Sequence, residues 1–376
     1  MNLSDFRKIF PITATDIYLN HAAVSPLSTS VKTAINDSLT RRTSGPVEIF
    51  PEYIEEKKRL KENLGRLINA DSSQIAIVSN TSEGLNCLAS GLTWKKGDRV
   101  LLVENEFPAN IYPFLNLERL GVSIDFVPTR QGHIFLEDIE NKITTRTRLL
   151  SISFVGFLNG FRNQLGDIGV LCKKKNVIFS VDGIQGTGGL PVDVTAAGID
   201  FLANGGHKWL MGPMGCGFIY ISPDLFDQLH PAYVGWLSVK DSWNFFDYRL
   251  DLLEDASRFE IATPNFLGIK GLRVSTDILL EAGIPSIEQH LLKLGDRLID
   301  GFSAQDFQYI GAGERQNRSG IYSFRTANEK ALFAHLQTQR VHLSLREDII
   351  RFAPHFYNTE GEIEEVLNIC RKFAEK

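Results

Sequence analysis

The sequence has few cysteines, no long apolar run and no surplus of basic residues. Its cysteines lie far apart and form no CxxC pair, which argues against a zinc site and a disulfide framework. No segment approaches the roughly 18 consecutive apolar residues that a membrane-spanning helix needs. The start, MNLSDFRKIF, lacks the apolar core of a secretory signal. We therefore expect a cytoplasmic protein without a metal centre, with reduced thiols at Cys87, Cys172, Cys216 and Cys370.

The charge balance narrows the possible partners. The chain carries 40 basic and 45 acidic residues, a net charge of −5, so nothing in its electrostatics favours nucleic acid or an anionic membrane. Its 376 residues correspond to roughly two domains. A hydrophobic fraction of 43% with 23% charged residues is typical of a globular protein with a large core.

The arrangement of apolar runs predicts an α/β fold. From residue 75 to 221, short β-branched runs alternate with helical patterns such as 81–94 and 108–120, which is typical of a parallel sheet with helices on both faces. The seven expected strands are QIAIVS, DRVLLVE, SIDFVP, LLSISFV, VIFSVD, IDFLA and GFIYIS. After residue 266, longer amphipathic helices, short strands and a helix over 359–375 predict a smaller α+β domain. We predict a large domain over 18–265 and a small domain over 266–376, with residues 1–17 packed on one of them.

Ligands of open parallel sheets bind beyond the carboxyl ends of the strands, so the residues that follow each strand are the candidate site. In VSNTSEGLN, Thr81 and Ser82 stand where a strand gives way to a helix. Such hydroxyls either cap the helix or, with the helix dipole, bind an anion such as a phosphate. No GxxxxGK[ST] motif and no GxGxxG after a strand is present, which removes the usual support for nucleoside triphosphates and nicotinamide cofactors.

Two further strand ends carry ionisable groups. Asp182 ends the apolar strand in VIFSVDGIQ, where a buried carboxylate is costly unless a cation meets it, although a turn residue is the simpler interpretation. Lys208 lies in the glycine-rich, apolar turn GGHKWLMG. Most lysines are solvated, but loss of water around this one would lower its pKa and make the amine a nucleophile.

A fourth strand end, ENEFPANIY, places Phe107 either in ordinary packing or against an aromatic ligand. Together the four segments match the needs of pyridoxal phosphate: a lysine for its aldehyde, an anion site for its phosphate, a carboxylate for its ring nitrogen and an aromatic face. The sequence therefore predicts a pyridoxal-phosphate site at this edge of the sheet.

The chain resembles the class V aminotransferase family of pyridoxal-phosphate enzymes, which have the aspartate aminotransferase type of fold. The resemblance runs from YLNHAAVSPL at 18–27 to APHFYNTEGEIEEVL at 353–367, and its most specific parts are SVDGIQ and GGHKWL. It implies that Lys208 forms the Schiff base with the cofactor and that Asp182 holds the pyridine nitrogen. It also implies that Gln185 donates a hydrogen bond to the ring hydroxyl oxygen.

The resemblance extends to the rest of the cofactor site. It implies that Thr81 and Ser82 bind the phosphate with His207 nearby, and that Phe107 stacks on the cofactor ring, as in kynureninase-like members. Thr263 in EIATPNFLGI matches the threonine that reaches the phosphate of the neighbouring subunit. A homodimer with shared active sites follows from that match.

Substrate residues come from the same resemblance. Arg351 in DIIRFAPHFYNT matches the arginine that holds the substrate carboxylate, a task suited to a two-pronged, permanently charged guanidinium. A surface salt bridge is the alternative for this residue. Asn20 and His21 match a family segment near the substrate entrance, although a lone histidine is more often structural.

The sequence departs from the desulfurase branch of the family. The stretch before the substrate arginine, QTQRVHLSLREDIIRF, lacks the mobile catalytic cysteine of desulfurases, which argues against sulfur transfer through a persulfide. A phosphate-binding serine is replaced by Gly205. The desulfurase asparagine near the cofactor oxygen is also missing, unless Asn159 takes its place.

The expected activity is that of a pyridoxal-phosphate enzyme acting on the α-carbon of an amino acid, with amino acid and keto acid as small-molecule partners. Transamination, elimination of a β-substituent and epimerisation would all use the same residues. We expect an aminotransferase, because transamination is the default reaction of the family and this chain lacks the desulfurase cysteine. A lyase or epimerase, resembling selenocysteine lyase, cysteine desulfurase or isopenicillin N epimerase, is the alternative. A non-enzymatic protein without pyridoxal phosphate is the third possibility.

Overall fold

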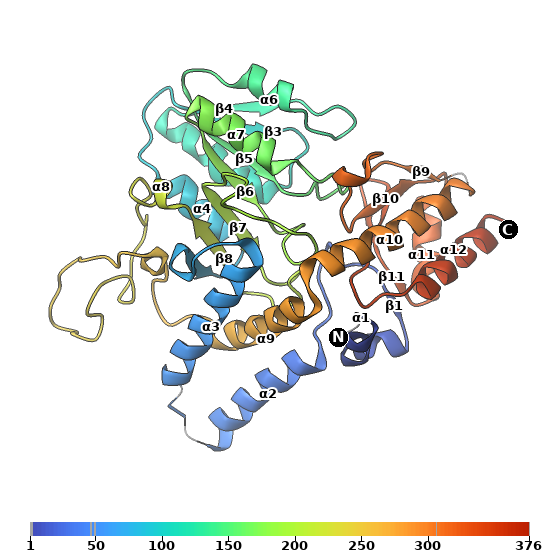
Figure 1. Cartoon of the computed structure of the whole chain (residues 1–376), viewed down its shortest axis with the longest axis horizontal. Coiled ribbons are helices and arrows are strands. Elements are labelled where there is room, and N and C mark those ends of the chain that lie inside the picture. The colour runs from blue at the N-terminus through green and yellow to red at the C-terminus, as the bar shows by residue number, and fades with distance from the viewer. Residues whose placement is uncertain (1–2, 46, 49, 306, 376) are drawn as a thin grey trace.

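A seven-stranded sheet forms the centre of the molecule (Figure 1). The computed structural model describes residues 3–45, 47–48, 50–305 and 307–375. The sheet order is β2-β8-β7-β6-β5-β3-β4; β8 is antiparallel to β2 and β7, and the other pairs are parallel. The predicted, mainly parallel α/β sheet is confirmed. Its strands are β2 (Ile75–Val78), β3 (Arg99–Val103), β4 (Ser123–Val127), β5 (Thr147–Ser153), β6 (Ile178–Asp182), β7 (Phe201–Gly205) and β8 (Gly217–Ile221).

The strands are apolar on both faces because helices cover both. Leu101, Ile152 and Val181 join one buried cluster, whereas Val100 and Leu149 join the other. Alternate residues of a strand point to opposite faces, so continuous apolar runs are what a two-sided core requires. The large-domain helices are α2 (Thr29–Ser44), α3 (Phe50–Ile68), α4 (Thr81–Gly91), α5 (Tyr112–Leu115), α6 (Leu136–Lys142), α7 (Leu165–Lys175), α8 (Pro223–Phe226) and α9 (Phe266–Ala282).

The helical pattern expected over 108–120 is broken in the structure. Two 3₁₀ turns, Pro108–Asn110 and Asn116–Leu120, flank the single α-helical turn α5. Pro108 and Pro113 each stand in the first turn of their element. Proline lacks the N–H that a helix interior needs and is tolerated only at a helix start, so each proline begins a new short element.

The C-terminal part is built on a four-stranded antiparallel sheet in the order β12-β13-β10-β9. Its strands are β9 (Gln308–Tyr309), β10 (Tyr322–Arg325), β12 (Ser344–Arg346) and β13 (Ile349–Phe352). Phe324, Ile350 and Phe352 point to one face and pack into a core with the helices α10 (Ile284–Ser303), α11 (Glu329–Thr338) and α12 (Glu360–Ala374). Neighbouring residues on the strands therefore point the other way, toward the large domain.

The N-terminal segment is tied to both parts of the fold. After α1 (Leu3–Phe6), strand β1 (Ile17–Tyr18) pairs in parallel with β11 (Val341–His342). The Phe10 ring stacks on Tyr357 at 4.3 Å between ring centroids. Helix α9 shares its buried cluster with the large-domain sheet and packs beside α2 and α3 in Figure 1. The division at residue 266 stays a prediction, and this packing favours a boundary after α9. Residues 1, 2, 46, 49, 306 and 376 of the predicted segments lie outside the described residues.

Candidate active site

Three neighbouring strands end at the same edge of the large sheet and bring the candidate residues together. Ser153 of β5 pairs with Asp182 of β6, which pairs with Ala203 of β7. Lys208 follows three residues after the end of β7. The carboxyl ends of parallel strands meet at one edge, so this proximity follows from the topology that the sequence predicted.

Asp182 is a buried carboxylate with little local compensation. It is 2% exposed and accepts one hydrogen bond, from the Ile184 backbone N–H at 3.0 Å. Its pKa is raised from 3.8 to about 7, mainly by burial; the nearby Glu106 also raises the pKa, whereas the Ile184 N–H and the ammonium of Lys208 lower it. A carboxyl in this position is suited to a cationic ring nitrogen, which would supply the missing charge.

Lys208 has the properties of a reactive amine. Its Nζ lies 5.6 Å from the centre of the Phe107 ring. Burial lowers its pKa from 10.5 to about 8, Asp182 opposes the shift, and the positive charges of Arg351 and Arg346 add to it. The amine is therefore neutral in a substantial fraction of molecules near pH 8, where most lysines are fully charged.

The start of α4 leaves a hydroxyl without a partner. The N-cap is Asn80, whose side chain accepts from the Glu83 N–H at 2.9 Å, so the interpretation of Thr81 and Ser82 as capping residues is wrong. Thr81 is 4% exposed and its Oγ1 has no hydrogen-bond partner among the described residues. Buried hydroxyls are normally paired, and an anion at this helix start would complete the hydrogen bonding of Thr81.

Gly205 and His207 lie beside this hydroxyl. A Cβ added at Gly205 would stand 3.2 Å from Thr81 Oγ1 and 3.3 Å from His207 Cε1. The same Cβ would stand 3.0 Å from Ile184 Cδ1, so a serine would crowd its neighbours here and the glycine lets Thr81 and His207 lie close together. Burial, followed by the charge of Lys208, lowers the pKa of His207. Ser82, the second predicted phosphate ligand, is exposed at the same helix start.

Gln185 is held in place by the protein on both sides. Its Nε2 donates to the Ala22 carbonyl at 3.0 Å, and its Oε1 accepts from the Trp209 indole N–H at 3.1 Å. A primary amide has two N–H groups, so one remains for a ligand. His355 contacts the Trp209 carbonyl through its Nε2 at 3.1 Å, which adds a second support to the turn that carries Lys208.

Phe107 presents its ring next to Lys208 and is 43% exposed. Its backbone N–H donates to the Glu106 side chain at 2.8 Å, and the same carboxylate accepts from Ser153 Oγ at 2.8 Å and Ser153 N–H at 2.9 Å. Burial raises the pKa of Glu106. Sequence reasoning missed Glu106, although its place just before the predicted stacking ring was the available signal.

Arg351 lies in β13 and is 3% exposed. Its Nε donates to Ser344 Oγ at 3.0 Å, and its Nη1 donates to the Phe157 carbonyl. Burial, with the charge of Arg346 as a second cause, lowers its pKa from 12.5 to about 10. No carboxylate pairs with it among the described residues, so a surface salt bridge does not explain this arginine.

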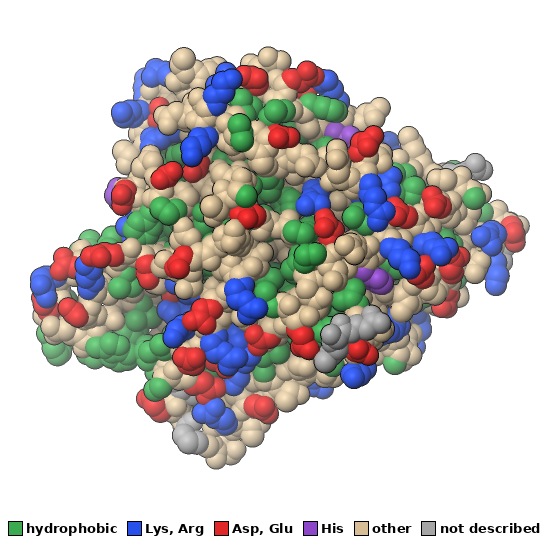
Figure 2. Space-filling view, in the orientation of Figure 1, with side chains coloured by type: hydrophobic (Ala, Val, Ile, Leu, Met, Phe, Trp, Pro, Cys, Tyr) green, Lys and Arg blue, Asp and Glu red, His purple; other side chains and the backbone are tan. Residues whose placement is uncertain are grey.

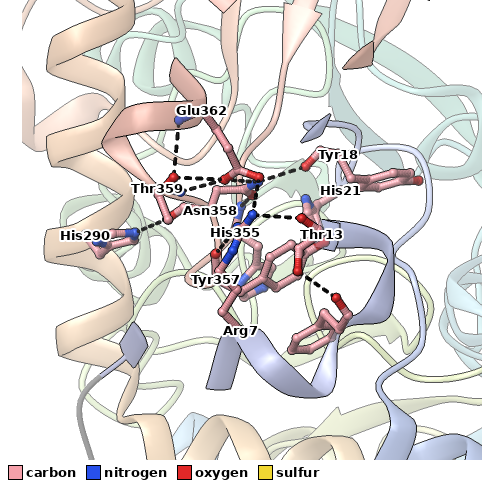
Figure 3. A network of polar contacts seen from close by, with 11 residues as sticks. Arg7, Thr13, Tyr18, His21, His290, His355, Tyr357, Asn358, Thr359 and Glu362 are labelled. Atoms are coloured by element: carbon pink, nitrogen blue, oxygen red, sulfur yellow. Dashed lines mark hydrogen bonds and ion pairs between the residues drawn. The ribbon is translucent and has the colours of Figure 1, made fainter. Parts of the chain in front are cut away.

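His21 lies where the N-terminal segment meets the C-terminal one (Figure 3). The preceding residue, Asn20, forms an isolated β-bridge with Ala353. Both His21 ring nitrogens are occupied: Nδ1 contacts the Ala353 carbonyl and Nε2 the Tyr357 hydroxyl, each at 2.8 Å. Complete burial lowers the pKa of His21 well below its usual value. These contacts give His21 a structural task. Asn20 Oδ1 is buried and unpaired within the part of the chain that the structure describes.

Thr263 lies apart from the residues above. It is exposed and lines a surface pocket with Ser79, Glu83 and Tyr53. Among the described residues, Thr263 forms no hydrogen bond with Lys208. Asn159 does not replace the missing asparagine, because its amide donates to the Gly132 carbonyl and accepts from the Phe161 N–H.

All four cysteines are buried. Burial raises the pKa of Cys87 to about 11 and the pKa values of the other three, Cys172, Cys216 and Cys370, to about 12. Thiols react as thiolates, so none of them is poised to act as a nucleophile.

The residues fit pyridoxal phosphate. The orphaned Thr81 hydroxyl at a helix start suits the phosphate, the buried Asp182 suits the ring nitrogen, and the Phe107 ring beside Lys208 suits the aromatic face. These assignments remain proposals for the individual residues.

Comparisons with known proteins place the fold and site in context. A family model described as "Aminotransferase class-V" matches residues 17–365. A "Probable cysteine desulfurase" from Methanothermobacter thermautotrophicus is 29% identical, with 97% of this chain and 96% of the relative covered. No helix among the described residues is long and apolar enough to cross a membrane.

Solved structures extend the likeness to three dimensions. The apo structure of a cysteine desulfurase from Thermococcus onnurineus has a TM-score of 0.91 at 26% identity, over 99% of this chain and 98% of the other. The cystine C–S lyase C-DES, in complex with its product cysteine persulfide, has a TM-score of 0.90 at 26% identity, over 96% and 99%. A C-DES variant carries glycine covalently linked to its PLP cofactor.

Proposed function

This chain belongs to the class V aminotransferase family and is a pyridoxal-phosphate-dependent enzyme, and we propose that it eliminates a sulfur-bearing β-substituent from an amino acid. The observation that carries the proposal is the position of the cysteines. All four are buried, and residues 337–352, which precede and include the substrate arginine, contain none. Elimination needs no protein thiol, because the sulfur departs with the leaving group.

The geometry supports the following cofactor site. Lys208 would hold the aldehyde and Asp182 the ring nitrogen, with Phe107 against one face. Thr81 and Ser82 would hold the phosphate at the start of α4, beside His207, and the free N–H of Gln185 would meet the ring hydroxyl oxygen. When bound, pyridoxal phosphate supplies an electron sink that stabilises negative charge at the substrate α-carbon.

The protein's own groups perform the remaining tasks. Arg351 would bind the α-carboxylate, and its orientation is set by Ser344 and the Phe157 carbonyl. Lys208 Nζ would accept the α-proton, since its lowered pKa leaves a substantial fraction of the amine unprotonated near pH 8. The bond from the β-carbon to sulfur then breaks, and sulfur keeps the electron pair. Addition of water to the remainder gives pyruvate and ammonia.

The similar proteins support elimination better than the transamination expected from the sequence. The relatives include desulfurases and a cystine C–S lyase, and both kinds of enzyme cleave a carbon–sulfur bond. A desulfurase that relays sulfur through its own thiol is disfavoured by the raised cysteine pKa values.

A homodimer remains part of the proposal. The loop around residues 233–250 exposes Trp243, Phe245, Phe246, Tyr248 and Leu250, with Phe246 87% exposed. Hydrophobic side chains gather at this end of the molecule in Figure 2. Apolar patches of this kind mark protein interfaces. Thr263 would reach the partner's site from such an interface, and light scattering of the purified protein would test the dimer.

The test is product analysis with cystine and the cofactor-loaded enzyme. We expect pyruvate and ammonia in equal amounts, together with cysteine persulfide. Lys208→Ala should abolish their release, whereas Lys32→Ala, at an exposed lysine of α2, should not. Formation of a keto acid with an equal amount of the amine form of the cofactor would identify transamination instead, and alanine from cysteine would identify desulfuration.

A further inference from the structure

Lys208 lies in a turn whose own backbone is permissive. The segment between β7 and β8 contains Gly206, Gly212 and Gly215, and glycine accepts many backbone conformations at little cost. Met211 in the same segment has a φ of 52°, in the left-handed region that residues other than glycine seldom adopt. Such a conformation persists only where the surrounding structure fixes it. The position of the Lys208 amine therefore depends on contacts from outside the turn.

The two ends of the chain supply such contacts, and each one is made to a backbone carbonyl of the turn. In the N-terminal segment, the Ser25 N–H donates to the His207 carbonyl at 2.9 Å, and Ser25 Oγ donates to the Lys208 carbonyl. In the C-terminal segment, His355 Nε2 lies 3.1 Å from the Trp209 carbonyl. Three successive carbonyls around the reactive side chain are thus held by two residues from distant parts of the sequence.

The hydrogen bonds of His355 define the state of its ring. Its Nδ1 lies 2.8 Å from the Phe356 backbone nitrogen, and because that N–H can only donate, Nδ1 accepts. The proton is therefore on Nε2, which donates to the Trp209 carbonyl. The ring is completely buried, and burial lowers its pKa from 6.5 to about 4. His355 is thus neutral near pH 7, with both nitrogens engaged by the backbone.

The Trp209 side chain extends this support to a second residue of the site. Trp209 is 1% exposed, and its indole N–H donates to Gln185 Oε1 at 3.1 Å. A Cβ at Gly320 would stand 2.3 Å from the indole Cη2, and a Cβ at Gly189 would stand 2.8 Å from Cε3. Both glycines therefore leave the space that the indole fills. A shift of the Trp209 backbone would move Gln185 as well as the reactive lysine.

We propose that Ser25 and His355 are positioning residues, which hold the backbone of the turn so that the Lys208 amine stays withdrawn from water beside the Phe107 ring. The inference rests on the proposed function, in which this amine binds the cofactor and accepts the α-proton. Nζ lies 5.6 Å from the centre of the Phe107 ring. If either contact is lost, the turn can relax and the ammonium can reach water. The pKa of Lys208 should then rise, because burial is the main cause of its lowered value.

The first measurement is the pKa of Lys208 in the cofactor-free protein, which does not depend on catalysis. The rate at which acetic anhydride acetylates Lys208, followed by mass spectrometry from pH 6 to 11, gives this pKa from the shape of the profile. We expect about 8 for the wild type. His355→Met should raise the pKa by about 1, which leaves roughly tenfold fewer neutral amines near pH 7. Ser25→Ala should raise it in the same direction.

A conservative variant tests whether the hydrogen bonds of His355 are responsible. Glutamine and methionine side chains have similar length, but only glutamine can accept from the Phe356 N–H and donate to the Trp209 carbonyl. His355→Gln should therefore keep the pKa of Lys208 close to the wild-type value, whereas His355→Met should not. A shift of equal size in both variants would contradict a role for these hydrogen bonds.

Kinetics separate positioning of the amine from binding of the substrate. In the cofactor-loaded enzyme, His355→Met should lower kcat for pyruvate release from cystine by about 10- to 100-fold, since small displacements of a reacting group have effects of this order. KM should change by less than about threefold, because Arg351 holds the substrate carboxylate. His355→Gln should restore most of kcat. A raised KM with unchanged kcat would show that His355 acts on Arg351 instead, and would overturn the inference.

His290→Ala is the matched control. His290 belongs to the same network in Figure 3 and contacts the Asn358 carbonyl at 2.8 Å, but within the described part of the chain it forms no hydrogen bond with the turn. This variant should change neither the pKa of Lys208 nor kcat. If His355→Met does not fold, Ser25→Ala gives the same test from the other end of the chain. An unchanged pKa of Lys208 in the folded variants would overturn the inference, whereas absence of pyruvate with the expected pKa changes would overturn only the proposed function.

Discussion

Replacing Asp182 by asparagine should stabilise the cofactor-free protein at neutral and alkaline pH. The carboxylate is buried with one hydrogen bond, and asparagine keeps an oxygen for the Ile184 N–H. The substitution therefore removes a buried charge without removing its partner. In the cofactor-loaded enzyme we expect the opposite, because the ring nitrogen then meets a neutral amide.

The magnitude follows from the pKa. Burial raises the pKa of Asp182 from 3.8 to about 7, and each unit corresponds to about 1.4 kcal/mol. The pKa of Asp182 is higher in the folded than in the unfolded protein. The wild type therefore loses stability as the pH rises from about 4 to about 7, and the loss is complete above about pH 7. The loss is on the order of 4 kcal/mol, and Asp182→Asn should recover most of it at pH 8 and almost none near pH 4.

Urea unfolding of cofactor-free wild type and variant from pH 4 to 8 measures the difference directly, with the midpoint and slope analysed together. Asp37→Asn, at an exposed position of α2, is the control and should show no such pH dependence. A variant of equal or lower stability at pH 8 would refute the assignment of an unfavourable buried charge to Asp182. Added pyridoxal phosphate should then stabilise the wild type more than the variant.

Three other outcomes follow from the site. The kcat/KM for pyruvate release should rise with pH, reach half of its maximum near pH 8 and level off above pH 9, because burial lowers the pKa of Lys208 to about 8 and only the neutral amine accepts a proton; a flat profile from pH 6 to 9 would contradict this role. Thr81→Val should leave the free energy of unfolding of the cofactor-free protein within about 0.5 kcal/mol, since its hydroxyl has no partner to lose, but should weaken cofactor binding measured by titration. Almost no thiol should react rapidly with a thiol reagent in the native protein, and four thiols should react after unfolding, because all four cysteines are buried. A fast-reacting thiol in the native enzyme would contradict this and would favour a sulfur relay through a cysteine.

The large-domain sheet could be predicted because its strands are buried on both faces and leave continuous apolar runs. The same logic placed Asp182 and Lys208 together, since both follow neighbouring strand ends. The break at Pro108 and Pro113 was visible in the sequence, but the apolar spacing dominated the helix prediction. A series of short helical turns, each begun by a proline, can keep apolar residues at helical spacing although no continuous helix forms.

Contacts between distant segments were beyond the reach of sequence reasoning. Thr81 looks like a capping residue until Asn80 is seen to occupy the cap. Glu106 has an ordinary loop sequence, and its contact with Ser153 depends on how β3 and β5 pair. The sequence shows the chemistry of each of these residues, but its role depends on which residues it contacts in the folded protein.

The N-terminal segment has a consequence for synthesis of the protein. Ser25 contacts the Lys208 carbonyl, while His21 is fixed by Ala353 and Tyr357 near the other end of the chain. The surroundings of the reactive lysine therefore remain incomplete on the ribosome until residues 353–357 have emerged, long after the large sheet has been made. We expect a chain that stops before residue 353 to fold its sheet but retain cofactor poorly.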